Sequence, residues 1–367
     1  MPITKIAASG FSDAVNFRNI IINGDMSIAQ RGTSFATMGN SDTQYTLDRF
    51  QWNEEGTFGD AELTITQDTT VPTGQGFAKS LKAACTTADT SIDSNTISYI
   101  TQKFEGQNLQ YLKRGTSSAE SLTLSFWARS NLTGTFTVAF KDIDNSRLYS
   151  ASYSPSSADT WEKFFITIPG DTSGALDNDN AHSFSVDWNL QAGTNKSNGA
   201  LTTAWEAQAE GDRAVGQTNF FSSTSNTFYL TGVQLEAGTS ASEFEFLPFD
   251  VNLQRCQRYF YKLIDVPGGD GNGYFTTGYL YSSSALLSWN EFPTIMRAAP
   301  TLSVASGTDY YIFYRDSAAD SFDGFDLVQG RVNGGMIRRT SQISGTAGQA
   351  GGIHSSSNSK ITFSSEL

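Results

Sequence analysis

Alternation of large apolar and polar side chains predicts β strands along most of the chain. Residues 121–129, SLTLSFWAR, place Leu122, Leu124 and Phe126 at every second position, and this spacing is typical of a strand with one buried face. Turn-forming groups such as Pro169-Gly170-Asp171 separate such runs at short intervals. Regularly spaced short strands with this punctuation predict a β-sandwich. The other runs in this part of the chain are residues 61–67, 80–85, 96–104, 134–141, 161–168, 183–190 and 227–235.

Three segments of the same region carry shorter patterns. Residues 17–30 predict a strand, a turn at Asn23-Gly24-Asp25 and a second strand. Residues 45–53, YTLDRFQWN, predict one continuous strand. Residues 104–115 predict a short helix that buries Leu109 and Leu112 and ends at Gly115, since glycine commonly follows the last helical turn.

The stretch 227–262 closes one predicted domain and opens another. Its alternating strand is interrupted by Gly232, which predicts a β-bulge. After a turn at residues 236–238, residues 249–262 predict a linker helix with Asp250 or Asn252 as N-cap. Leu253, Cys256 and Phe260 lie at helical spacing and form one apolar stripe. The stripe packs either on the domains or around a three-fold axis, and the pattern leaves both open.

The remaining residues predict a small C-terminal β domain. Aromatic and small residues alternate over 274–289, and further strands are expected at 301–305, 310–314, 325–328 and 359–363. The sequence therefore predicts an all-β protein in four parts. These are an N-terminal arm (1–16), a β-sandwich (17–248), a linker helix (249–262) and the C-terminal β domain (263–367).

Composition and charge limit the kinds of partner that are expected. The 367 residues carry a formal charge of −13, and neutralising nucleic-acid phosphates needs clustered Lys and Arg, so nucleic acid is not expected as a partner. Cys85 and Cys256 are far apart in sequence and are expected as free thiols. The N-terminus is too short and too polar for a signal peptide or a membrane span, so membrane insertion is not expected.

Four motifs, NIIINGDMSIAQRGTSF, YTLDRFQW, LTLSFWAR and FYLTGVQLEAG, together resemble the tail-fibre-like virion structural proteins of marine tailed phages. Their order is also similar to that of jelly-roll carbohydrate-binding modules. The resemblance covers roughly residues 17–261, and FPTIMRAAPTL is similar to the small β unit that often follows in those phage proteins. It implies a jelly roll, a homotrimer, attachment to other virion proteins through the N-terminal arm, and contact with host glycans.

The resemblance also implies a possible calcium ion, although no cofactor is required. In the carbohydrate-binding modules a structural calcium lies near the Asn-Gly-Asp start, where Asn23 and Asp25 of this chain could supply oxygens. The sequence departs from that pattern, because Ser27 stands where a glutamate often lies and Thr231-Gly232 replaces an acidic pair. The alternative is that Asp25 is an ordinary turn residue.

Sugar binding requires exposed aromatic planes beside hydrogen-bonding side chains. Trp205, in the polar excursion of residues 191–217, is the first candidate for a glycan platform. Trp188, flanked by Asp187 and Asn189, is the second. The alternative for Trp205 is a side chain that covers loop or subunit contacts.

Two functions fit these observations. The first is a tail fibre or receptor-binding protein on the virion surface that contacts host surface glycans. The second is a capsid or tail decoration fibre that acts in assembly and particle stability without a sugar site. An enzyme is not expected, because the two histidines, His182 and His354, belong to no catalytic motif. A glycan depolymerase would need two facing carboxylates, which the abundance of acidic residues neither supports nor excludes.

Overall fold

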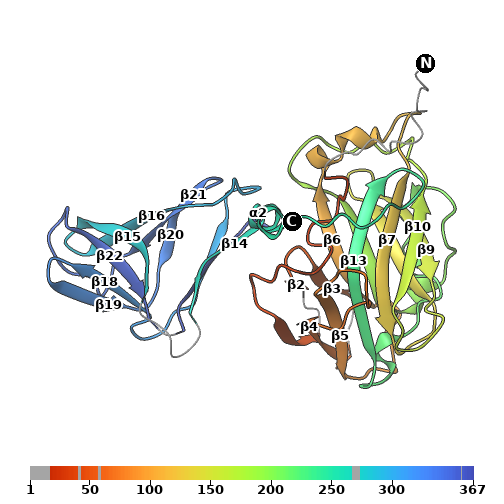
Figure 1. Cartoon of the computed structure of the whole chain (residues 1–367), viewed down its shortest axis with the longest axis horizontal. Helices are drawn as coiled ribbons and strands as arrows, with labels where there is room; N and C mark the ends of the chain where they lie inside the picture. Colours follow the sequence, from red (N-terminus) through yellow and green to blue (C-terminus); the bar gives the residue numbers. More distant parts are fainter. Residues whose placement is uncertain (1–16, 40–42, 57–58, 267–272, 357) are drawn as a thin grey trace, which may run out of the picture. The chain divides into compact units, whose positions relative to one another are not determined.

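The computed structural model describes residues 17–39, 43–56, 59–266, 273–356 and 358–367. The chain forms two compact units (Figure 1). The first runs up to Ser27 and continues through Thr33–Thr46 and Phe50–Leu247; the second consists of Ile28–Gly32, Leu47–Arg49 and Pro248–Leu367. The N-terminal arm of residues 1–16, expected to dock on a virion, lies outside the described residues.

The first unit is a jelly-roll β-sandwich of two antiparallel sheets. The chain crosses from one sheet to the other after β5, β6 and β7 in succession, and such crossings distinguish a jelly roll from a simple meander. The six-stranded sheet has the order β1 (Ser34–Gly39), β4 (Glu62–Asp68), β5 (Ser80–Thr87), β13 (Thr227–Ala237), β7 (Leu122–Ser130), β10 (Glu162–Ile168). The seven-stranded sheet has the order β12 (Glu206–Ala207), β9 (Arg147–Tyr153), β8 (Phe136–Asp142), β11 (His182–Ala192), β6 (Ile97–Glu105), β3 (Gln51–Glu55), β2 (Thr43–Tyr45).

The alternating side chains fill the space between the two sheets, as the sequence predicts. Phe126 of β7 and Trp188 of β11 meet edge to face with ring centroids 6.1 Å apart, and both are buried. The predicted bulge in β13 is confirmed, because its register with β7 shifts between Thr231 and Gln234, and Gly232 has φ +61°. The bulge turns Val233 away from β7, and its N–H donates to the carbonyl of Gly24 at 2.9 Å.

Three predictions for the first unit are wrong. Residues 17–30 contain no strand; the segment is irregular and is held by bonds such as Ile20 N–H to the Leu235 carbonyl at 2.8 Å. The run 45–53 is split into β2 and β3, because Arg49 has φ +71°, which a strand cannot accommodate. The predicted helix at 104–115 is two 3-10 turns, η2 (Gly106–Asn108) and η3 (Gln110–Leu112). Strands β1 and β9 were not predicted.

The second unit combines a short helix, α2 (Phe249–Gln257), with two further sheets. The smaller sheet has the order β14 (Phe260–Asp265), β23 (Lys360–Ser364), β17 (Thr301–Val304). The larger has the order β19 (Ala318–Phe322), β18 (Tyr311–Arg315), β22 (Ala350–Ser355), β15 (Gly273–Ser282), β16 (Ala285–Glu291), β21 (Gly334–Arg339), β20 (Asp326–Arg331). Buried side chains such as Phe313, Ile353 and Phe363 form its core. The predicted all-β fold is confirmed.

The helix differs from its prediction at both ends. Pro248 occupies the N-cap position, Asp250 lies in the first turn, and Asn252 is buried inside the helix, so neither residue is the N-cap. Because α2 ends at Gln257, Phe260 belongs to β14 rather than to a helical stripe. Cys256 and Phe260 are nevertheless buried, whereas Leu253 is half-buried. Cys256 and Phe260 therefore pack within the second unit.

Two short segments from the N-terminal third complete the second unit through buried polar contacts. The Arg49 guanidinium lies 3.6 Å from the centroid of the Tyr259 ring and is ion-paired with Glu366. Arg31 pairs with the same carboxylate at 3.0 Å and covers the ring of Phe260. The contacts fix residues 28–32 and 47–49 against the C-terminal end of the chain.

Both cysteines are free and buried, as expected. Burial raises the pKa of the Cys85 thiol to about 11 and raises that of Cys256 well above its ordinary value. The thiols are therefore protonated at neutral pH and behave as small apolar side chains.

Candidate functional site

The outer face of the large sheet in the second unit exposes five aromatic rings. We call this surface the aromatic face. Between 36% and 71% of the surface of each of these side chains is exposed. The aromatic face consists of Tyr274, Tyr279 and Tyr281 on β15, Trp289 on β16 and Tyr314 on β18.

A bulge in β15 brings Tyr274 to this face. Leu280 is buried in the core, so Tyr279 and Tyr281, its neighbours in the alternation, point outward. The register with β22 shifts between Tyr274 and Thr276. The shift lets Phe275 pack against the core rings of Tyr311 and Phe325, 6.2 and 6.4 Å away. Tyr274 consequently faces outward with the other two tyrosines.

Small residues of β22 form the floor beneath these rings. Gly352 pairs with Tyr314 on one side and with Thr277 on the other. His354 lies between two rings of the face, with centroids 3.4 Å from Tyr274 and 4.6 Å from Tyr314. Burial lowers the pKa of His354 below its ordinary value, so this imidazole is neutral at pH 7. The three rings form one connected aromatic group.

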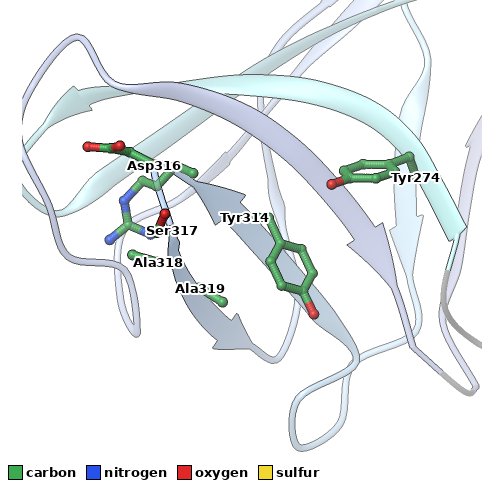
Figure 2. A pocket seen from close by; sticks show the side chains of 7 residues that line it. Tyr274, Tyr314, Asp316, Ser317, Ala318 and Ala319 are labelled. Carbon is green, nitrogen blue, oxygen red and sulfur yellow. The ribbon is translucent and has the colours of Figure 1, made fainter.

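A cavity of about 420 Å³ opens beside this group. Its lining is Tyr274, Tyr314 and the hairpin turn of residues 315–319. Figure 2 shows Tyr274 on one side, the turn residues Asp316 and Ser317 on the other, and Tyr314 between them. Asp316 and Ser317 have positive φ angles of 33° and 62°, the conformation of a tight hairpin turn. Both side chains are exposed at the turn.

This arrangement offers the two kinds of contact that carbohydrates use. Tyrosine rings present flat apolar faces, against which the C–H face of a pyranose can stack. The carboxylate of Asp316 and the hydroxyl of Ser317 can bond sugar hydroxyl groups at the edge of the same cavity. The cavity lies near the lower limit of the 300–1,000 Å³ range of ligand pockets.

The two predicted tryptophans lie in the first unit and expose no ring face. Trp205 is 7% exposed, its indole N–H donates to the Pro169 carbonyl at 2.8 Å, and its ring lies 4.1 Å from the Arg114 guanidinium. Trp188 is in the core. The structure corrects the expectation of exposed rings, because Trp205 covers an end of the sandwich core instead of projecting from its loop.

The two polar neighbours of Trp188 are buried in intramolecular contacts. Asp187 accepts from the Thr101 hydroxyl and pairs with Lys141 at 2.8 Å. Asn189 donates to the Thr137 hydroxyl and to the Arg213 carbonyl at 3.0 and 3.1 Å. Both point to the sheet face opposite the core, where Arg213 and Ala214 of the excursion pack; the excursion also carries α1 (Thr194–Ser197) and η4 (Glu210–Asp212). They meet Arg213 of the excursion rather than an open cleft.

The Asn-Gly-Asp segment forms a turn. The carbonyl of Asn23 accepts from Met26 N–H at 3.0 Å, and the Asp25 carboxylate accepts from the Ser27 hydroxyl at 3.0 Å. Among the described residues, no three His, Cys, Asp or Glu side chains converge in a way that could hold a metal ion. These contacts are those of a turn, and calcium at Asn23 and Asp25 stays a prediction.

The sequence shows the aromatic residues of this face, but it does not show that they point to solvent rather than to the core. Tyr274, Tyr279 and Tyr281 belong to the run of aromatic and small residues noted at 274–289. Alternation alone does not tell which of the two sets faces solvent. The signal that could have given the direction is the pair Gly278 and Leu280, which lie on the buried side of β15. That side has no room for large rings, because a Cβ on Gly278 would lie 2.9 Å from Ile353.

Neither a protein-family model nor a curated protein sequence matches the chain. Among solved structures, it is similar to the enzymatically active domain of tailspike protein 4 of bacteriophage CBA120, at 13% identity and a TM-score of 0.29 over 55% of this chain. This chain covers 21% of the length of that domain. It is also similar to a CBM4 structure (12% identity, TM-score 0.29, 59% of this chain and 98% of that one). The family 11 carbohydrate-binding module of Clostridium thermocellum Lic26A-Cel5E is similar at 15% identity and a TM-score of 0.27, over 56% and 97% of the two chains. No conclusion about this chain's function rests on likeness at these scores.

No helix in the described part of the chain has the length and apolar character needed to cross a membrane.

Proposed function

We propose that this chain is a structural protein of a phage particle, a tail fibre or receptor-binding protein on the virion surface, that contacts host surface glycans through the aromatic face. The four ordered motifs of the first unit support the virion role. The aromatic face supports the glycan contact, and it is the observation that carries this part of the proposal. The proposed activity is binding, without a catalytic step.

Exposure of the aromatic face to water is unfavourable unless a ligand covers it. Exposed large apolar side chains scattered singly are normal on protein surfaces, whereas a contiguous group marks an interaction site. Two of the five rings, Tyr274 and Tyr281, are about 70% exposed, so the fold gains little from burying them. A ligand that stacks on these rings would gain roughly 1 kcal/mol for each well-placed ring.

The assembly that accompanies this function is a homotrimer attached to other virion proteins through residues 1–16. Because Cys256 and Phe260 are buried within the second unit, the three-fold contact would use other surfaces. Static light scattering of the purified chain at micromolar concentration should give three times the mass of one 39.8 kDa chain. A mass equal to that of one chain would contradict the homotrimer but would not bear on the glycan proposal.

The glycan proposal is tested on a glycan array with the full-length chain and three variants. Tyr274→Ala and Tyr281→Ala each remove one ring of the aromatic face and should reduce the bound signal at least about fivefold, the equivalent of roughly 1 kcal/mol. Tyr111→Ala removes a half-exposed tyrosine of the first unit and should leave binding unchanged. Silence of the wild-type chain on every glycan would overturn the proposal and favour the decoration fibre.

A further inference from the structure

We infer that the cavity at the β18–β19 turn takes an uncharged pyranose with adjacent hydroxyl groups, one unit of a longer neutral glycan, and rejects acidic sugars. This inference rests on the proposed function and specifies the chemical class of its ligand. It follows from the charges around the cavity rather than from the aromatic rings, which would stack on neutral and acidic sugars alike.

Asp316 is the carboxylate that the cavity presents to a ligand. It lies at the exposed turn between β18 and β19, in the lining of the cavity. Within the described residues, neither its carboxylate nor the Ser317 hydroxyl takes part in a hydrogen bond or ion pair. An exposed carboxylate can accept hydrogen bonds from two neighbouring hydroxyl groups at once, because it has two oxygens and about four lone-pair positions.

The positive charge beside Asp316 is already compensated. Arg315 also lines the cavity, but it is ion-paired with Asp320 at 2.9 Å, and it donates to the Ser344 carbonyl. Only 5% of the Arg315 side chain is exposed. Asp320 is held in turn by the N–H of Ser344 at 2.8 Å. Arg315 therefore has a fixed partner, and its Nη1, which makes no hydrogen bond, is buried and out of reach of a ligand.

A carboxylate or sulfate group on the ligand would consequently meet an unpaired negative charge. Two unit charges about 4 Å apart repel by roughly 1 kcal/mol in water and by several kcal/mol near a protein surface. Rejection of acidic sugars by this repulsion is a specificity device that a purely aromatic surface lacks.

The size of the cavity sets how much of the glycan it holds. A volume of about 420 Å³ suits one or two sugar units. The rest of a longer chain would continue along β15, where Tyr279 and Tyr281 are exposed. Tyr281 lies seven positions after Tyr274, so at about 3.3 Å per residue the strand offers roughly 20 Å of aromatic surface.

The inference is tested by calorimetry with matched oligosaccharides. The probes are linear oligomers of glucose, galactose and mannose, and oligomers of equal length of the corresponding uronic acids. The wild-type chain should bind at least one neutral series about tenfold or more tighter than its acidic counterpart. Asp316→Asn removes the charge but keeps an acceptor oxygen, and should narrow that ratio to about threefold or less. Asp326→Asn removes an exposed carboxylate of β20 and should leave the ratio as in the wild type.

Two outcomes would overturn the inference while leaving the proposed function intact. In the first, acidic oligomers bind as tightly as neutral ones; in the second, Asp316→Asn leaves the ratio of the two affinities unchanged. In both cases binding would still be lost in Tyr274→Ala. The absence of binding in every series, or binding that survives both Tyr274→Ala and Tyr281→Ala, would overturn the proposed function as well. The two failures are therefore distinguishable.

Discussion

The ring of Tyr274 occupies the space above Gly352. A Cβ atom built on this glycine would lie 1.9 Å from Cε1 of Tyr274, and its three nearest neighbours are all atoms of that ring. The absence of a side chain at position 352 therefore lets the ring lie down on β22, beside His354. The position of Tyr274 at the edge of the cavity depends on this glycine.

Gly352→Ala is expected to displace the Tyr274 ring and to weaken glycan binding. Because Tyr274 is mostly exposed, its ring can swing away at little cost, and the free energy of unfolding should change by less than about 1 kcal/mol. Affinity should fall about as much as in Tyr274→Ala. Calorimetry and urea denaturation measure the two quantities.

Gly273→Ala is the matched control on the same unit. A Cβ there meets no atom within 4 Å, so both affinity and stability should stay at the wild-type values. Unchanged glycan affinity in Gly352→Ala would show that the placement of Tyr274 does not matter for binding.

The sandwich was predictable because its strands are long and alternate large apolar with polar residues, as residues 122–130 and 227–237 do, although nearly every position of both strands is buried. The break in the alternation at Gly232 marked the bulge correctly. The run 45–53 had the same alternation but is not one strand. Arg49 leaves the pattern there, since it is buried in the second unit against Tyr259. A distant partner of this kind is invisible in a local pattern.

The predicted exposure of Trp205 is wrong for a related reason. Trp205 lies in a polar segment rich in Gly and Asn, and such a composition is typical of an exposed loop. Burial of one side chain within a loop depends on what the loop covers. Here it covers Phe184 and Tyr149, whose rings lie 5.9 and 6.0 Å from the indole. Conversely, the aromatic residues of β15 give the strand a composition typical of a buried strand, yet its tyrosines face outward.

Gly24→Ala should destabilise the first unit. A Cβ at position 24 would lie 2.0 Å from the carbonyl oxygen of Val233, and this backbone is fixed by the bulge at Gly232. Backbone cannot turn aside as a side chain can, so the cost should be about 1–3 kcal/mol, as for other overpacked sites. Urea denaturation followed by tryptophan fluorescence measures it. Gly59→Ala is the control, because its nearest neighbour is the Asp89 side chain at 3.1 Å; equal midpoints for the two variants would refute the steric argument.

The ion pair between Arg49 and Glu366 should matter more than any exposed pair. Arg49→Met leaves Glu366 with Arg31 alone and removes the cation from the Tyr259 ring. Loss of one partner of a buried pair costs about 3–5 kcal/mol, and the second unit should unfold correspondingly earlier. Lys113→Met breaks the exposed pair with Glu120 and should change stability by less than about 1 kcal/mol.

A double variant separates the charge from the packing of Arg49. If the ion pair causes the loss, Arg49→Met combined with Glu366→Gln should be more stable than the sum of the single effects predicts. Strict additivity, measured by thermal denaturation of all four chains, would mean that the two side chains act independently.

The excursion over the seven-stranded sheet should weaken in acid. Burial by itself would raise the pKa of Glu55, but the hydrogen bonds and charge of Arg213, helped by Tyr99 and Lys141, outweigh it and lower that pKa to about 2. A carboxylate whose pKa is lowered by folding contributes stability above its ordinary value of 4.5 and loses it as the pH falls toward 2. Because 40% of the Glu55 side chain is exposed, solvent screening reduces this contribution to about 1 kcal/mol.

The melting temperature of the wild-type chain should therefore fall between pH 4.5 and pH 2 more steeply than that of Glu55→Gln, which has no proton to take up at this position. At pH 6 the wild type should be more stable than the variant by the contribution of the ion pair, and this difference should nearly vanish at pH 2. Arg213→Met tests the other partner and should lower stability at pH 6 while flattening the same acid slope. Parallel melting curves for wild type and Glu55→Gln across this window would show that the bond between Glu55 and Arg213 does not hold the excursion in place.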